Sequence, residues 1–152
     1  MLAAALALAL HPAAAPDRAP TRIRPDLYAA GPWRLRVTRD AFARTTTCRI
    51  GDRDGEVRHG VLLWSLGSDV DTSRAVWRID AGEPRRQALL DLPASANLDN
   101  PSDGRLAVPV ALLAGARWVE TRPSPRAHVR RLNVAQLDDL LVAADRLGCA
   151  RP

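Results

Sequence analysis

Lysine is absent from this chain of 152 residues, so all 22 basic residues are arginines, against 17 acidic residues and a formal charge of +5. Arginine is the stronger partner for phosphate and carboxylate groups, because its planar guanidinium donates two parallel hydrogen bonds. A lack of lysine beside many alanines and prolines is also typical of a GC-rich genome. Arginines outnumber acids over 16–60 and 116–152 but not over 61–115, so we expect a basic face if the two ends of the chain meet.

Long apolar runs are scarce as well. The one that approaches membrane length covers residues 2–10, shorter than the roughly 20 residues of a membrane-spanning helix. His11 and Pro12 end the run and three alanines follow, which is the pattern of an export signal. We expect residues 1–15 to be a signal peptide, the mature chain to have no transmembrane segment, and the protein to be periplasmic or secreted. An alanine-rich buried or frayed helix is the alternative.

Prolines gather directly after this run. Four of them lie between residues 16 and 32, and each fixes its own φ angle and lacks an N–H donor. We therefore expect an extended proline-rich arm over 16–27 and a single β-rich domain over 28–152, a length that suits one hydrophobic core.

Only two cysteines are present, Cys48 and Cys149, near the two ends of the expected domain. In an exported protein an even number of cysteines predicts a disulfide. Two unpaired buried thiols or a metal pair are the alternatives, although a metal site needs about four ligands and no histidine or cysteine neighbours either position. The predicted bridge ties the C-terminal helix to an N-terminal strand.

Residues 33–38 alternate strictly between apolar and polar side chains, as a half-buried strand does. Arg34 and Arg36 therefore point away from the apolar face. Further strands are expected at 45–50, 56–66, 74–80 paired with 87–92, 105–110, and 117–121 paired with 128–132. Because no long helices alternate with these strands, the pattern predicts a mainly β fold, an antiparallel sandwich or curled sheet.

One helix is expected, over 134–147, where apolar residues recur at helical spacing. Asn133 is placed to cap its first turn, with Gln136 completing a capping box, and Gly148 suits the position after its end. We expect this C-terminal helix to pack on the β-sheet.

Sequence motifs of catalysis are missing. There is no nucleophile elbow, no glycine-rich phosphate loop and no paired-histidine zinc motif. Ser68 suits a turn, His59 suits a half-buried strand position, and His128 is expected to be exposed. The sequence therefore assigns no catalytic residue and no cofactor.

Two acidic clusters have some of the spacing of a metal site. Asp69 and Asp71 alternate, and Asp99 begins a segment that partly resembles a calcium loop. Such a loop needs oxygen ligands at its third and twelfth positions, where this chain has Pro101 and Val110. Turn chemistry explains both clusters, and no metal site is expected.

The candidate binding residues are arginines. Arg34 and Arg36 come from the first strand, and Arg126, Arg130 and Arg131 come from the region of the last one. If the disulfide draws these regions together, they form one face that attracts an anionic envelope component, such as a phosphorylated glycan or a lipid headgroup. Nucleic acid is disfavoured, because aromatic residues make up only 4% of the chain and stacking platforms need them.

The overall layout resembles uncharacterised small exported proteins of Alphaproteobacteria. The resemblance rests on Trp33, Arg39-Asp40-x-Phe42, Cys48-Arg49, Asp99-Asn100-Pro101, Gly104, Val108-Pro109 and Gly148-Cys149. A vaguer likeness is to the exported invasion-associated locus B family, which also has a Trp-led strand, cysteines and a late Val-Pro-Val segment. This chain lacks that family's additional cysteines, so its role is not carried over.

Together these features predict an exported, non-enzymatic β-rich domain of the cell envelope that is structural or ligand-binding. An inhibitor or accessory protein that docks on another envelope protein is the first alternative. A hydrolase whose site assembles only in space is the second, and it requires His59 or His128 to lie in a cleft with an acid and a serine.

Overall fold

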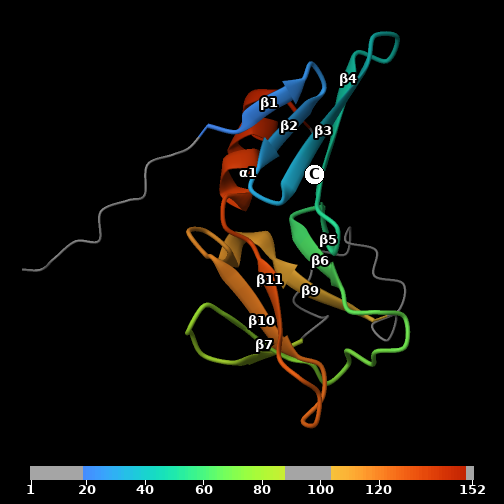
Figure 1. The fold of residues 1–152 in the computed structure, drawn as a ribbon. Coiled ribbons are helices and arrows are strands. Elements are labelled where there is room, and N and C mark those ends of the chain that lie inside the picture. The colour runs from blue at the N-terminus through green and yellow to red at the C-terminus, as the bar shows by residue number, and fades with distance from the viewer. Residues whose placement is uncertain (1–18, 88–103, 150–152) are drawn as a thin grey trace, which may run out of the picture.

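The computed structural model describes residues 19–87 and 104–149. They form two antiparallel sheets and one α-helix (Figure 1). The strand order is β1-β2-β3-β4-β5-β6-β9 in the seven-stranded sheet and β11-β10-β7-β8 in the four-stranded sheet. The bounds are β1 Thr21–Arg24, β2 Leu27–Ala30, β3 Trp33–Asp40, β4 Thr45–Gly51, β5 Gly55–Arg58, β6 Val61–Ser65, β7 Val76–Ile79, β8 Arg85–Arg86, β9 Arg105–Pro109, β10 Trp118–Arg122, β11 Arg130–Asn133 and α1 Leu137–Arg146. The predicted mainly β fold is confirmed.

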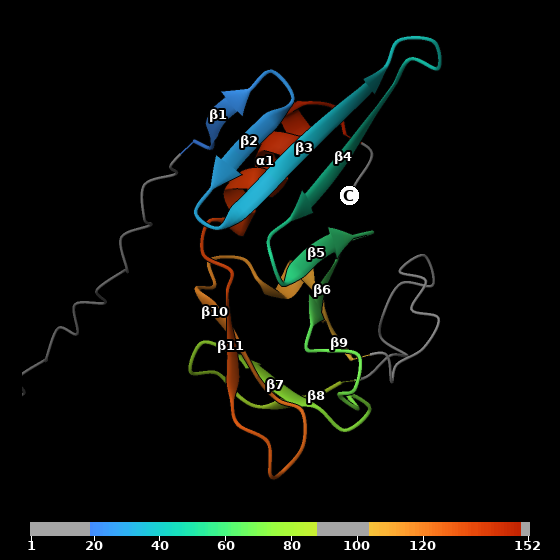
Figure 2. The same cartoon turned by 45° about the vertical axis from the view of Figure 1, so that its right-hand side comes forward.

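The strict alternation of β3 sets the core of the larger sheet. Trp33, Leu35 and Val37 are buried, whereas Arg34 and Arg36 are exposed. Helix α1 packs on the buried side of β2, β3 and β4 and leaves their other side open (Figure 2). The predicted helix on the sheet is thus confirmed.

The disulfide prediction is also confirmed. Cys48 lies on β4 and Cys149 lies three residues after α1. Their Cα atoms are 5.6 Å apart, inside the usual range of roughly 4.4–6.8 Å for a disulfide. The bridge fastens the end of the helix to the sheet on which it packs.

The two sheets join at a tryptophan. Trp33, at the start of β3, is fully buried and donates its indole N–H to the carbonyl oxygen of Asn133 at the end of β11, over 2.9 Å. Side chains of both sheets and of α1 share one apolar cluster. The core therefore continues from one sheet to the other.

The proline-rich arm differs from the expectation, because β1 lies within residues 16–27 and pairs with β2. Pro20 and Pro25 stand just outside the two ends of β1, where neither removes a hydrogen bond from the ladder. The sheet consequently begins before residue 28.

The expected strand over 56–66 is wrong, since a turn at His59 and Gly60 divides it into β5 and β6. Both turn residues have positive φ angles, 50° and 78°, which suit a tight hairpin. His59 is therefore exposed and not half-buried.

The helix begins at Leu137, three residues later than expected. Gln136 adopts a left-handed φ of 69° and forms no capping box. The Asn133 side chain instead accepts a hydrogen bond from the backbone N–H of Ala135 at 2.9 Å. That local turn satisfies the asparagine before the helix starts.

Two expected segments fall on residues that the structure does not describe. The signal peptide, 1–15, is one. The expected strand 87–92 is the other, apart from Gln87; in the described part, β7 pairs instead with the short β8. Within the described residues, 19–87 and 104–149, no helix is long and apolar enough to cross a membrane.

Candidate functional site

Arginines line up across the open side of the larger sheet. The register of β3 and β4 places Arg36 directly opposite Arg49. Leu27 on β2 lies opposite Arg36, and Arg24 on β1 lies opposite Leu27. All three arginines are exposed. We call Arg24, Arg36 and Arg49 the arginine row.

Arg34 lies beside this row, two residues before Arg36 on the same face of β3. Its guanidinium donates hydrogen bonds of 2.9 Å to the carbonyl oxygens of Gly31 and Trp33. These bonds hold the cation against the turn between β2 and β3. Because its partners are neutral carbonyls, Arg34 still adds positive charge to the face.

The arginine row has no acidic partner among the described residues. The strand register puts Asp40 and Glu56 on the same face, but both are engaged elsewhere. Asp40 accepts the backbone N–H groups of Phe42 and Ala43, and Glu56 pairs with Arg58 at 2.9 Å. Like charges directly opposite on neighbouring strands repel, so an external anion would relieve the contact between Arg36 and Arg49.

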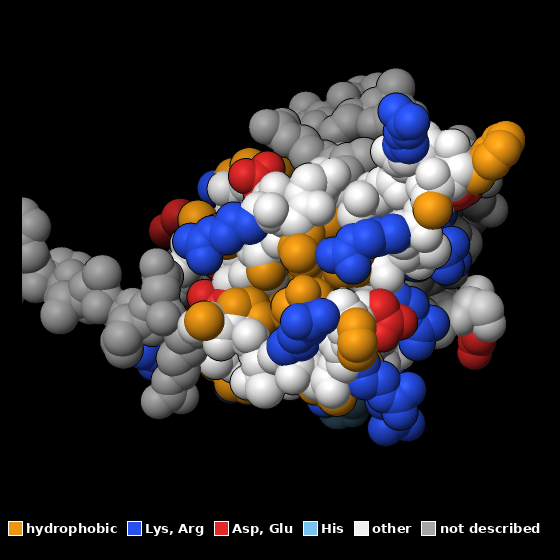
Figure 3. Space-filling view, turned by 90° about the horizontal axis from the view of Figure 1, so that it is seen from above, with side chains coloured by type: hydrophobic (Ala, Val, Ile, Leu, Met, Phe, Trp, Pro, Cys, Tyr) orange, Lys and Arg blue, Asp and Glu red, His pale blue; other side chains and the backbone are white. Residues whose placement is uncertain are grey.

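Beyond the row, the β3–β4 hairpin projects past the rest of the sheet (Figures 1 and 2). Phe42 at its tip is 100% exposed. The Asp40 carboxylate holds the tip by accepting two backbone N–H groups at 2.8 and 2.9 Å. Arg39 and Arg44 flank the turn. Seen from above, this end of the molecule has apolar side chains lying between arginines (Figure 3).

The arginines predicted from the last strand are engaged differently. Arg130 donates to the carbonyl oxygen of Leu66, and Arg131 pairs with Glu120. Both lie on β11, in the four-stranded sheet. Arg34 and Arg36 lie on β3, in the seven-stranded sheet, so the two groups of arginines do not lie on one sheet. Arg126 is exposed in the loop between β10 and β11.

Glu120 sits between two arginines on the outer side of the four-stranded sheet. The register places Arg78 on one side of it and Arg131 on the other. The Arg78 Nε atom lies 2.6 Å from one carboxylate oxygen, and the Arg131 Nε atom lies 2.8 Å from the second. These hydrogen bonds lower the pKa of Glu120 below its usual value. Arg131 also lies over the Trp118 ring, 5.4 Å from its centroid.

The residues considered for catalysis lie on the exposed surface. His59, His128 and Ser68 are all exposed, and Ser68 donates its hydroxyl to its neighbour Asp69 at 2.8 Å. Neither histidine lines the groove over β7, β8 and β10 or the shallower one beside Arg117 and Trp118. No group of three His, Cys, Asp or Glu residues in the described ranges is placed to hold a metal ion. Asp99 and Pro101 lie outside those ranges.

Sequence reasoning missed Arg24, Arg49 and Phe42. The signal for Arg49 was present, because the residues around Cys48 alternate and place Arg49 on the polar side of its strand. No local pattern reveals that Arg49 pairs with Arg36 in register.

Comparison with known proteins adds no assignment. No protein-family model matches the chain, and no curated protein or solved structure shows significant similarity to it. The resemblance to small exported alphaproteobacterial proteins therefore stays a prediction.

Proposed function

We propose that this protein is an exported, non-enzymatic domain of the cell envelope that binds an anionic surface through its arginine row. The observation that carries the proposal is the direct opposition of Arg36 and Arg49 on exposed strands without an acidic partner among the described residues. Such a pair costs stability in the free protein. An anion that bridges the two guanidinium groups recovers that cost, which gives the arrangement a binding role.

The proposed compartment follows from the disulfide. Structural disulfides persist in oxidising compartments such as the periplasm and the extracellular space. The Cys48–Cys149 pair and the export pattern in residues 1–15 support the same location. Both features support our proposal that the protein acts in the periplasm or outside the cell.

The hairpin tip favours a lipid surface over a soluble polyanion. A phosphorylated glycan offers no apolar surface on which a phenyl ring can be buried, whereas a bilayer buries such a ring at the level of its headgroups. Phe42 is fully exposed, and Arg39 and Arg44 stand beside it to meet the phosphates. The protein thus combines an apolar anchor with a basic face on one sheet.

Binding to vesicles tests the proposal. Phosphatidylglycerol vesicles should bind the protein at low salt, and phosphatidylcholine vesicles should not. The attraction should weaken as added salt screens it. Replacing Arg36 and Arg49 by glutamine should weaken binding about thirtyfold, because each arginine near an anionic surface contributes about 1 kcal/mol.

The matched control removes the same charge elsewhere. Arg53 lies in the turn after β4, and Arg146 lies at the end of α1; both are exposed. The Arg53→Gln/Arg146→Gln variant should bind as the original protein does. Equal losses in both double variants would show that net charge alone drives binding and would overturn the site.

Phe42→Ser separates the lipid from the soluble polyanion. Burial of a phenylalanine side chain contributes about 1.5–3 kcal/mol, so vesicle binding should fall about tenfold or more. Binding to a soluble polyphosphate should not change, since it involves only the arginines. If Phe42→Ser leaves vesicle binding intact, the target is an anionic polymer and not a bilayer.

The exposed tip also favours one alternative, an accessory protein that docks on another envelope protein. A projecting aromatic side chain fits a partner's pocket as well as a bilayer. This alternative predicts no binding to vesicles or polyphosphate at low salt. That result would overturn the anionic-surface proposal.

A further inference from the structure

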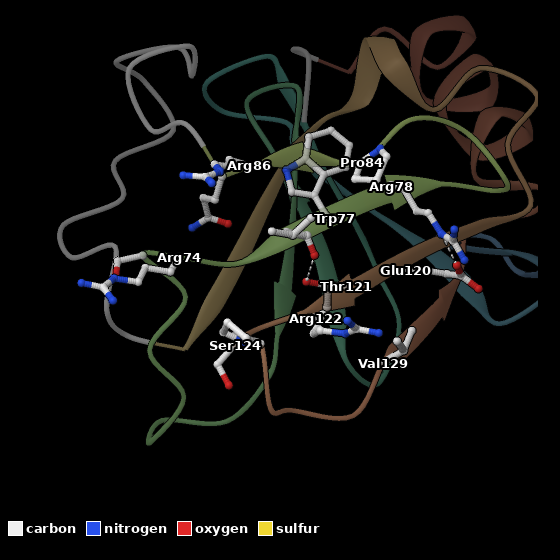
Figure 4. Close-up of a pocket in the computed structure, with 14 residues that line it drawn as sticks. Arg74, Trp77, Arg78, Pro84, Arg86, Glu120, Thr121, Arg122, Ser124 and Val129 are labelled. Carbon is white, nitrogen blue, oxygen red and sulfur yellow. Dashed lines mark hydrogen bonds and ion pairs between the residues drawn. The ribbon is translucent and has the colours of Figure 1, made fainter.

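A groove lies on the four-stranded sheet, away from the arginine row. Its volume is about 770 Å³, within the range of about 300–1,000 Å³ typical of sites for small ligands. Strands β7, β8 and β10 and the loop after β10 line it (Figure 4). The loop contributes Ser124, Pro125 and Val129.

Two arginines flank a valine in this groove. The strand register puts Arg86 on one side of Val76 and Arg122 on the other. Since neighbouring strands lie about 4.8 Å apart, the two arginine backbones are about 10 Å apart. In the structure the two guanidinium groups point away from each other (Figure 4). Both side chains are long and exposed, so rotation about their side-chain bonds brings both groups within reach of a single anion held above Val76.

The groove is basic although an acid lines it. Glu120 is already bonded to Arg78 and Arg131. Arg86 and Arg122 are exposed and form no ion pair with another described residue. Their charge is therefore available to a ligand.

Apolar side chains lie beside these charges. Val76 is 36% exposed and Val129 is 51% exposed, and both line the groove. Solvent-exposed valines between cations offer a surface that an alkyl chain can cover. Trp77 also lines the groove, and its buried indole N–H has no acceptor among the described residues. We expect its fluorescence to change when a ligand binds.

We propose that this groove binds a small amphiphilic carboxylate. The carboxylate lies between Arg86 and Arg122, which donate charge-assisted hydrogen bonds to it. Its alkyl chain lies on Val76 and Val129. This site is independent of the arginine row, because it lies on the other sheet and uses none of the same residues.

Titration with decanoate, below the concentration at which it forms micelles, tests the proposal by calorimetry and tryptophan fluorescence. Decanoate should bind, whereas acetate, which lacks the chain, and decanol, which lacks the charge, should bind about tenfold more weakly or not at all. Arg122→Gln and Val129→Asp should each weaken decanoate binding about tenfold or more. Both positions are exposed, so thermal unfolding should show that the variants still fold.

Arg53→Gln removes an arginine outside the groove and should leave decanoate affinity unchanged. Arg36→Gln/Arg49→Gln should also retain decanoate affinity. Failure of the proposed vesicle binding by the arginine row would therefore leave this test unaffected. Equal affinity for decanol would overturn the role of the arginines. Unchanged decanoate affinity in both groove variants, or no binding of decanoate at all, would overturn the site.

Discussion

The two sheets each carry arginines across an exposed face, but only the arginines of the smaller sheet are paired with an acidic residue. On the larger sheet Arg36 faces Arg49 with no acid between them. On the smaller sheet Arg78 and Arg131 face each other across Glu120. One acidic residue thus decides whether a pair of arginines supports the fold or remains available to bind.

Burial explains why Glu120 is effective. Its exposed fraction is 5%, so its charge would be costly without partners. Charge-assisted hydrogen bonds from Arg78 and Arg131 satisfy it, and they also fix the positions of both guanidinium groups. The arginine row has no comparable constraint among the described residues, which leaves its guanidinium groups free to reach an external anion.

The largest expected effect comes from breaking the joint between the two sheets. Trp33→Ala should lower the free energy of unfolding by about 3–5 kcal/mol, because the fully buried ring leaves a cavity. Trp33→Phe keeps most of the packing and loses the hydrogen bond to Asn133, which should cost about 1 kcal/mol. Urea unfolding measures both. Equal losses in the two variants would contradict the importance of the ring's packing.

Removal of the disulfide should come next in size. Cys149→Ser should cost roughly 2–5 kcal/mol, mainly because the unfolded chain regains the freedom that the bridge removes. Cys48→Ser should give the same loss, and so should reduction of the original protein. Stability that does not change on reduction would show that the bridge contributes nothing to the fold.

Acid should weaken the smaller sheet through Glu120. The folded state lowers the pKa of this group, so its stabilising contribution is present above the unfolded value of about 4.3. The contribution is lost as the pH falls below that value and through the lowered pKa of the folded state. Glu120→Gln should be less stable at neutral pH and lose less stability on acidification.

Urea midpoints between about pH 7 and pH 3 measure this difference. Asp71 has a pKa lowered by hydrogen bonds from Ser73, and it should weaken the original protein and Glu120→Gln alike. If acidification destabilises the two proteins equally, Glu120 is excluded as the source of the pH dependence.

The sequence predicted the strands that alternate strictly, such as β3, and the terminal helix. It failed where a feature depends on pairing between distant segments. Arg131 looked available because nothing nearby in the sequence shows that Glu120 lies opposite it on the next strand. The turns at His59 and Gln136 were not predicted either. Both residues have positive φ angles, which are uncommon for residues other than glycine.

The smallest expected change in stability comes from substitutions in the arginine row. The variant that carries them is one of the two compared in the central test. Arg36→Gln/Arg49→Gln should leave the urea midpoint unchanged or slightly higher, because two opposed like charges are removed. Its binding to phosphatidylglycerol vesicles should fall about thirtyfold.

The most direct test compares that variant with Arg78→Gln/Arg131→Gln, which removes the same charge from the smaller sheet. The account predicts that this second variant loses stability, because Glu120 is left buried without partners, while its vesicle affinity in the folded state is retained. The reverse pattern, or the same losses of stability and affinity in both variants, would contradict the division of the two arginine faces into a binding face and a structural one.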